Sequence, residues 1–177
     1  MEEKLIGNTR LVLTEGDITQ AQTEVIVNAA NSSLAGGGGV DGAIHRAGGP
    51  QIMAECRQIG GCPTGQAVIT TAGRLKAKKV IHTVGPIYQG RPEDPKLLAD
   101  CYKNSLALAA RHGLKSVAFP SISTGAYGYP LDEAAQVALI AVKEAIEADP
   151  RAFDEVRFIL YGGKAYEAYQ KALAQVG

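Results

Sequence analysis

The sequence predicts an α/β protein, a three-layer α/β/α sandwich around a mixed, mostly parallel sheet of six strands. Short apolar runs rich in β-branched residues, such as Val25–Val27, alternate along the chain with longer segments of helical periodicity, as in open α/β sheets. Two strand, loop, helix units have loops of small residues, Gly36–Gly39 in one and Pro120–Pro130 in the other. Because the sequence shows no linker or repeat, we expect a single domain over residues 1–177.

The chain opens with two short strands that predict a hairpin, Lys4–Ile6 and Arg10–Leu13, joined by Gly7–Thr9. The hairpin makes the sheet mixed. Helices and strands then alternate, each helix carrying apolar residues three or four positions apart. The expected strands after the hairpin are 25–27, 67–71, 80–86, 115–119 and 156–160, and the expected helices are 40–47, 95–111, 131–148 and 163–176.

The first small-residue loop has the composition of a binding site. Asn28 and Asn31 follow a strand that suits burial on both faces, and so lie at the carboxyl edge where open α/β sheets bind ligands. The glycines Gly36–Gly39 permit positive φ and let backbone amides approach a ligand closely. Val40–Ala47 then reads as a helix with Asp41 at its start, where unpaired amides favour an anion.

Two better-known phosphate-binding patterns fit this loop poorly. Gly37, Gly39 and Gly42 match G-x-G-x-x-G, but they follow the strand at a distance, and no acidic residue ends the next strand at Ala67–Thr71. The sequence has no G-x-x-x-x-G-K-[ST] motif. A dinucleotide-dependent dehydrogenase is therefore a remote alternative, and a P-loop enzyme is not supported.

The second loop, Pro120–Pro130, follows the strand Lys115–Phe119 and opens a helix at Leu131. If both units lie on one sheet, the two loops close over a ligand from opposite sides. Neither loop carries Lys or Arg, and the first basic residue after the glycines is Arg46. We therefore expect neutral amides and helix dipoles to hold any phosphate.

Together these motifs resemble the macrodomains of the MacroD type. The resemblance is carried by N-A-A-N at Asn28–Asn31, G-G-G-G-V-D-G-A-I-H-R-A-G at Gly36–Gly48, G-D-I-T at Gly16–Thr19 and S-T-G-x-Y-G-Y-P at Ser123–Pro130. It spans nearly the whole chain and is strongest toward bacterial members that act on O-acetyl-ADP-ribose. The resemblance implies the same fold.

The resemblance also implies that the partners of the chain are ADP-ribose and its derivatives, mono-ADP-ribosylated proteins among them. Asp17 would accept a hydrogen bond from the adenine amine, the Ile18 amide would reach the ring, and Tyr161 would stack on it. The diphosphate and distal ribose would be wrapped largely by backbone amides, with Tyr127 covering the sugar. The other ligand-binding residues implied are Asn28, Gly38, Gly39, Val40, Ser123, Thr124, Gly125, Ala126 and Tyr127.

Asp41 and Asn31 are the catalytic residues that the resemblance implies, holding a water that attacks an ester bond. Because a helix N-terminus stabilises a carboxylate, we expect Asp41 to orient the water more than to take its proton. The expected activity is deacetylation of O-acetyl-ADP-ribose or removal of mono-ADP-ribose from acidic side chains, with no cofactor and no metal. The alternatives are a non-catalytic ADP-ribose reader and an ADP-ribose-1''-phosphate phosphatase.

Each assignment has a purely structural alternative. Asp17 and Asp41 are also well placed to cap helices, and Asn31 to close a turn through its side chain. Tyr161 is then an ordinary half-buried aromatic residue near a strand end. His82, inside an apolar strand, reads as a hydrogen-bonded core histidine more than as a catalyst.

Composition excludes several other classes. Lys plus Arg equals Asp plus Glu, 18 each, so no net charge points to nucleic acid or a membrane. Cys56, Cys62 and Cys101 form no C-x-x-C pair and have no His at zinc-site spacing, so neither a metal site nor a redox motif is predicted. The first residues lack an apolar signal segment, and the expected location is the cytoplasm.

Overall fold

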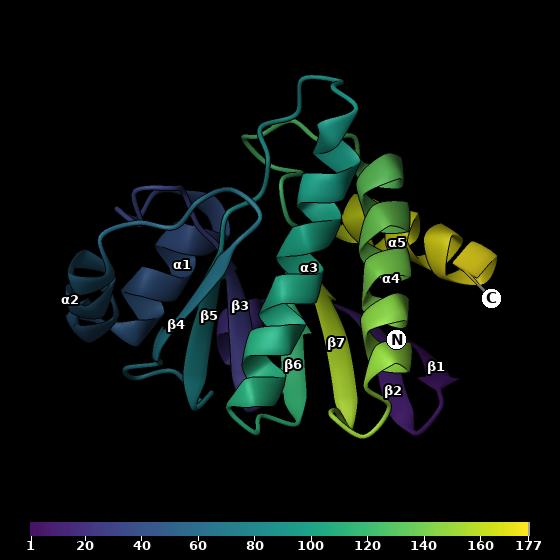
Figure 1. The fold of residues 1–177 in the computed structure, drawn as a ribbon, viewed down its shortest axis with the longest axis horizontal. Coiled ribbons are helices and arrows are strands. Elements are labelled where there is room, and N and C mark those ends of the chain that lie inside the picture. The colour runs from purple at the N-terminus through teal and green to yellow at the C-terminus, as the bar shows by residue number, and fades with distance from the viewer. Residues whose placement is uncertain (177) are drawn as a thin grey trace.

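A computed structural model, which describes residues 1–176, places a single sheet between two layers of helices (Figure 1). The α/β/α class is confirmed, but the expected number of six strands is wrong. The sheet has seven strands in the order β1-β2-β7-β6-β3-β5-β4. The strand segments expected along the chain, both hairpin strands and the run Ala67–Thr71 among them, all join this one sheet.

The elements follow the predicted alternation along the chain. The strands are β1 (Glu2–Ile6), β2 (Thr9–Glu15), β3 (Val25–Ala29), β4 (Ala67–Thr71), β5 (Lys79–Thr83), β6 (Ser116–Phe119) and β7 (Glu155–Leu160). The helices are η1 (Ile18–Gln20, a 3₁₀ turn), α1 (Gly39–Gly48), α2 (Pro50–Ile59), α3 (Glu93–Arg111), α4 (Leu131–Ala148) and α5 (Gly163–Val176).

Strand directions bring the two small-residue loops to one edge of the sheet. β2, β7, β6, β3 and β5 pair in parallel, whereas β1 and β4 are antiparallel strands at the two outer edges. β3 and β6 are direct neighbours, so the loops that follow them leave the sheet side by side. The expectation that both loops share one sheet is confirmed.

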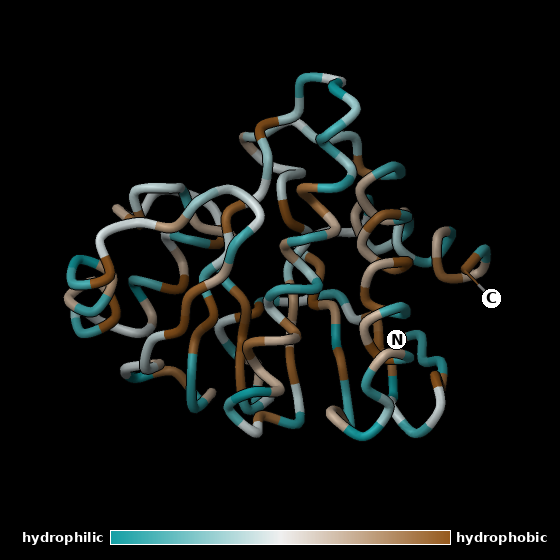
Figure 2. The backbone as a smooth tube through the Cα atoms, in the orientation of Figure 1, coloured by the Kyte–Doolittle hydropathy of each residue, from teal (hydrophilic) through white to brown (hydrophobic). Residues whose placement is uncertain are grey.

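The core consists of two apolar clusters, one on each face of the sheet. Val25 and Val27 point into the cluster shared with α3, α4 and α5, while Ile26 points into the cluster shared with α1 and α2. All three side chains are at most 1% exposed, as expected for a strand buried on both faces. Figure 2 shows this as hydrophobic colour along the central strands.

Helix α2 was not predicted from the sequence. It begins with Pro50 at its first turn and ends at Gly60, but only Ile52 and Cys56 are buried along it. Two buried residues make too narrow a stripe for the helical periodicity to stand out. The other helices begin and end within two residues of their predicted bounds.

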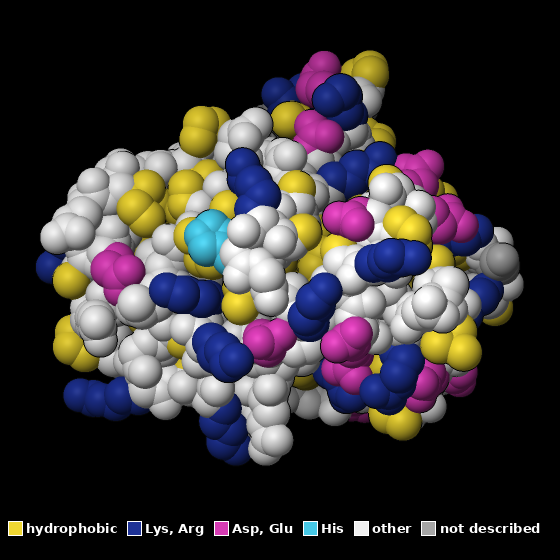
Figure 3. All heavy atoms as spheres, turned by 60° about the horizontal axis from the view of Figure 1, so that its bottom comes forward, with side chains coloured by type: hydrophobic (Ala, Val, Ile, Leu, Met, Phe, Trp, Pro, Cys, Tyr) yellow, Lys and Arg dark blue, Asp and Glu magenta, His cyan; other side chains and the backbone are white. Residues whose placement is uncertain are grey.

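The surface opposite the two small-residue loops carries charges of both signs. Figure 3 shows Lys and Arg side chains interspersed with Asp and Glu there, in keeping with the equal totals in the sequence. Within residues 1–176, none of the helices combines the length and apolar character that crossing a bilayer requires.

Candidate functional site

A cleft of about 860 Å³ opens at the carboxyl edge of the sheet, between the loops that follow β2, β3, β6 and β7. Its volume suits a nucleotide-sized ligand. The lining residues are Gly16, Asp17, Ile18, Gly39, Val40, Ala43, Arg46, Pro120, Ser121, Thr124, Gly125, Leu131, Ile159, Tyr161, Gly162, Gly163, Lys164 and Ala165.

Seven of the predicted ligand-binding residues lie on this lining: Asp17, Ile18, Gly39, Val40, Thr124, Gly125 and Tyr161. Two cations lie there as well, Arg46 on α1 and Lys164 at the start of α5. The expectation that neutral amides and helix dipoles hold a bound phosphate therefore stays a prediction, with two cations close enough to contribute. The small-residue loops lack basic residues, but the helices beside them supply two.

At one end of the cleft, Asp17 is both a helix cap and a residue of the cleft lining, the two alternatives that the sequence left open. It is the N-cap of η1, where its Oδ1 accepts hydrogen bonds from the Thr19 amide (2.9 Å) and the Thr19 hydroxyl (2.7 Å). The helix-cap alternative is confirmed, and Asp17 still borders the cleft. Tyr161, just after β7, is 88% exposed, so its ring faces are free for stacking.

The glycine loop is held in place by the Asn31 side chain. Asn31 Nδ2 donates to the Gly36 carbonyl (2.9 Å), and Asn31 Oδ1 accepts from the Ser33 hydroxyl (3.0 Å) and the Ala35 amide (3.0 Å). The turn-closing alternative is thus confirmed for Asn31. One hydrogen of its amide group remains for a ligand or a water.

The loop passes very close to the helix that follows it. A Cβ atom at Gly42 on α1 would lie 2.5 Å from the carbonyl oxygen of Gly37, closer than real atoms pack. Glycine at position 42 therefore allows the loop to lie directly against α1. Gly36 and Gly39 have positive φ, 81° and 57°, as anticipated for a loop that only glycine fits.

Asp41 lies in the first turn of α1 and is 6% exposed. Its Oδ1 accepts from Asn28 Nδ2 (2.8 Å) and lies 3.3 Å from His45 Nε2. A Cβ atom at Gly37 would lie 3.6 Å from Asp41 Oδ2 and 3.9 Å from Asn31 Nδ2. Asp41 Oδ2 and the Asn31 amide therefore border the same small space beside the glycine loop.

Asn28 is fully buried, and its side chain does not reach the cleft lining. The structure places Asn28 beneath Asp41, whereas the resemblance to macrodomains implied that Asn28 contacts the ligand. The physical reason is its position inside β3, where the side chain points at the underside of α1. His45, one turn further along α1, is the second neighbour of Asp41.

A buried histidine lies behind Asn28, and the interpretation of His82 from the sequence as a hydrogen-bonded core residue is confirmed. His82 on β5 is 0% exposed and lies 3.1 Å from Asn28 Nδ2 through Nδ1, and 2.9 Å from Thr70 Oγ1 through Nε2. Burial lowers the pKa of His82 to about 4. No local motif could have signalled these contacts, because they join residues on three separate strands.

His45, Cys56 and His82 bring one potential metal-ligand atom each to within 4.8 Å of one another. Spacing along the chain did not reveal this cluster. Burial raises the pKa of the Cys56 thiol to about 11, so the sulfur is protonated at neutral pH. Cys56 and His82 are thus neutral, hydrogen-bonding groups beneath the carboxylate of Asp41.

The second loop is anchored from below. Ser123 has a positive φ of 68°, which is unusual for a residue other than glycine, and its hydroxyl donates to the Pro86 carbonyl (2.8 Å). Tyr169 on α5 donates to Ser121 Oγ (2.8 Å), and Thr124 Oγ1 donates to the same atom (2.9 Å). The predicted ligand contacts Gly38, Ser123, Ala126 and Tyr127 lie in the two loops but not on the cleft lining.

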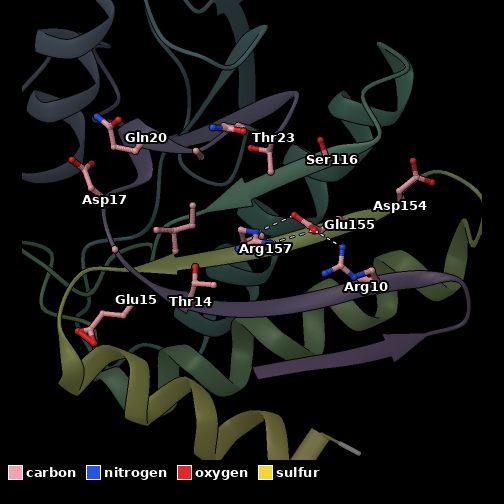
Figure 4. A pocket seen from close by; sticks show the side chains of 14 residues that line it. Arg10, Thr14, Glu15, Asp17, Gln20, Thr23, Ser116, Asp154, Glu155 and Arg157 are labelled. Atoms are coloured by element: carbon pink, nitrogen blue, oxygen red, sulfur yellow. Dashed lines mark hydrogen bonds and ion pairs between the residues drawn. The ribbon is translucent and has the colours of Figure 1, made fainter. Parts of the chain in front are cut away.

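A second hollow, about 670 Å³, lies over the strands β2, β7 and β6, beyond the part of that face of the sheet that α1 and α2 cover (Figure 4). Its two arginines are already paired, Arg10 with Glu3 and Glu155, and Arg157 with Glu155. It contains neither of the small-residue loops. The cleft at the carboxyl edge is therefore the candidate site.

An α/β sandwich with glycine-rich and serine-rich loops around such a cleft defines a class of nucleotide-type ligand-binding domains. Residues 27–138 match the Macro domain family. The O-acetyl-ADP-ribose deacetylase of Cronobacter turicensis is 53% identical over 171 residues, which cover 94% of this chain and 97% of that protein. The chain belongs to the macro domain family.

Solved structures show the same relationship. The Oceanobacillus iheyensis macrodomain with ADP has a TM-score of 0.95 and 42% identity, covering 99% of this chain and 95% of that chain. The Trypanosoma brucei macrodomain in complex with ADP-ribose has a TM-score of 0.88 and 42% identity, covering 92% of this chain and 68% of that chain. The predicted resemblance to macrodomains is confirmed.

Proposed function

We propose that this protein is an ester hydrolase that binds the ADP-ribose moiety and acts at its distal ribose. Its substrates are O-acetyl-ADP-ribose, from which it releases acetate, and mono-ADP-ribose esters of acidic protein side chains. A water held by Asp41 and Asn31 attacks the acyl carbon, the bond from that carbon to the ribose oxygen breaks, and the proton that the water loses ends on the ribose oxygen. The reaction needs no metal ion and no cofactor.

The arrangement of Asp41 is the observation that carries this proposal. Its Oδ1 is held by Asn28 at 2.8 Å and lies 3.3 Å from His45 Nε2, which fixes the plane of the carboxylate. Oδ2 is then left to face the space that it shares with the Asn31 amide. An oriented carboxylate beside a free N–H group is suited to holding a single water in a defined position.

The cleft supports a diphosphate-bearing ligand. Its walls are the two small-residue loops, the start of α1 and the start of α5, so backbone amides face the cavity from both sides. Arg46 and Lys164 add positive charge. Asp17 and the exposed ring of Tyr161 lie together on the lining, where an adenine base can be held by a hydrogen bond and by stacking.

Relatives support the same reading. The Cronobacter protein is named for deacetylation of O-acetyl-ADP-ribose, and the solved structures contain ADP or ADP-ribose.

The test follows O-acetyl-ADP-ribose by chromatography with the native protein and with Asp41→Ala. We expect the native protein to yield ADP-ribose and acetate, also in the presence of EDTA. Loss of the oriented carboxylate is expected to slow turnover by about 10² to 10⁴-fold, with ADP-ribose affinity retained. Asp132→Ala, which removes an exposed Asp from the first turn of α4, is the matched control and is expected to turn over normally.

Binding of ADP-ribose without any turnover would make the protein a reader and contradict the proposal. Release of inorganic phosphate from ADP-ribose-1''-phosphate, without acetate release from the acetyl ester, would place it among the phosphatases.

A further inference from the structure

Both ring nitrogen atoms of His82 are engaged behind the candidate site. It lies on β5 directly opposite Asn28 of β3 in the parallel register, so the two side chains share one face of the sheet. Both are 0% exposed. The same face is covered by α1, which carries Asp41 and His45, and by α2, which carries Glu55 and Cys56.

The orientation of Asn28 follows from its neighbours. Asp41 can only accept a hydrogen bond when it is ionised, so the group 2.8 Å from Asp41 Oδ1 must be the NH₂ end of Asn28. The reverse orientation would place the Asn28 carbonyl against the carboxylate. Asn28 Oδ1 has no hydrogen-bond partner within residues 1–176, so bonds at the NH₂ end alone hold the amide in place.

The second hydrogen of the same NH₂ group points at His82 Nδ1, 3.1 Å away. Nδ1 must therefore carry a lone pair that accepts this hydrogen bond. The proton of the neutral ring then lies on Nε2, which is 2.9 Å from Thr70 Oγ1. Thr70 in turn donates to the Thr71 carbonyl at 2.9 Å. A chain of hydrogen bonds thus runs from the Thr71 carbonyl through Thr70, His82 and Asn28 to Asp41. With this tautomer, each bond in the chain has one donor and one acceptor.

We infer that His82 is a positioning residue: its Nδ1 lone pair orients the Asn28 amide, and that amide orients the carboxylate of Asp41 toward the glycine loop. The inference rests on the function proposed above for Asp41. His82 lies on a strand outside the cleft. It is therefore expected to affect the rate of turnover without changing the affinity for the ligand.

Two substitutions of His82 separate this role from simple core packing. Asn presents an acceptor near the place of Nδ1, whereas Gln presents its NH₂ group near the place of Nε2. His82→Asn therefore keeps the acceptor for Asn28, and His82→Gln keeps the donor for Thr70. The expected result is a kcat within about threefold of native for His82→Asn, and a loss of about 10 to 100-fold for His82→Gln, with ADP-ribose Kd unchanged in both.

A matched control removes a buried hydrogen bond far from the site. Thr9 is 0% exposed, and its hydroxyl donates to the Phe153 carbonyl at 2.7 Å. Thr9→Val lowers stability but is expected to leave kcat unchanged. If the kcat values of all three variants simply follow their melting temperatures, His82 has a structural role only and the inference is wrong.

A second measurement does not depend on turnover. Imidazole ¹⁵N shifts of the native protein at pH 7 are expected to show His82 unprotonated at Nδ1 and protonated at Nε2, with slow exchange of the Asn28 amide protons. A proton on Nδ1 would overturn the inference. If the native protein binds ADP-ribose but hydrolyses nothing, the proposed function fails, and the ring tautomer still decides whether His82 orients Asn28.

Discussion

At the scale of single residues, the site is built from side chains whose partners lie far away in the sequence. The sequence pointed to Asp17, Asn31 and Asp41 as candidates because they stand in local motifs close to glycines, and the structure places Asp17 on the cleft lining and the other two beside Gly37. The contact between Asn28 and His82 could not be predicted, because it depends on the register of two strands 54 positions apart. Burial then turns His82 into a neutral ring.

The buried ring makes stability depend on pH. The unfolded chain binds a proton at His82 near pH 6.5, whereas the native protein binds one only near pH 4. The contribution of His82 to the free energy of unfolding is therefore complete above about pH 6.5 and is lost as the pH falls toward 4. Lowering the pH from 7 to 5 should cost about 2 kcal/mol in the free energy of unfolding from this residue alone.

Urea titrations of the native protein and of His82→Asn at both pH values measure this effect. The groups that face the ring, Asp41, His45, Glu55 and Cys56, are present in both proteins, so the difference between them isolates His82. An equal loss of stability in both proteins would show that the ring does not resist protonation.

The cysteines are expected to be unreactive in the native state. All three are buried free thiols, and burial raises the pKa of Cys56 and Cys101 to about 11. Few thiolates are present at pH 8, and a reagent cannot reach them. A thiol-reactive dye should label the native protein much more slowly than the protein in urea, and rapid labelling of the native protein would contradict the burial.

At the scale of elements, the glycine loop and α1 form one unit. The sequence predicted this unit well, because its strand, glycines and helix are contiguous. Helix α2 was missed, because only Ile52 and Cys56 of its residues face the core. The close approach of Gly42 to the Gly37 carbonyl also needed coordinates, since nothing local distinguishes Gly42 from its neighbours.

Gly42→Ala tests that approach. The added methyl group would meet the Gly37 carbonyl oxygen at 2.5 Å, so the loop must move away from α1. We expect a loss of about 1 to 3 kcal/mol in stability, together with weaker ADP-ribose binding. Gly38→Ala is the comparison, because a Cβ atom at Gly38 meets nothing within 4 Å. Calorimetric titration and thermal melts of both variants measure the two effects, and equal stability of the two would contradict the contact.

At the scale of the whole molecule, parallel strands deliver four loops to one edge and thereby place both ends of the cleft on one rigid sheet. Alternating strands and helices were enough to predict this layered plan. The order of strands along the sheet was not predicted, because pairing depends on contacts between segments that local patterns do not encode.

One sheet with two continuous cores is expected to unfold as one unit. Calorimetry should show a single transition for the chain, and ADP-ribose at 100 times its Kd should stabilise it by about 2.7 kcal/mol. Two separate transitions would contradict the single domain that the sequence predicted.

The antiparallel strand β1 leaves one long edge of the sheet with unpaired backbone groups. Its exposed residues are Glu2, Glu3 and Leu5, with the half-buried Lys4 between them. A second molecule that added its own strand here would have to strip water from these charges before any ladder could form. The hairpin that begins the chain thus also protects the folded protein against edge-to-edge aggregation.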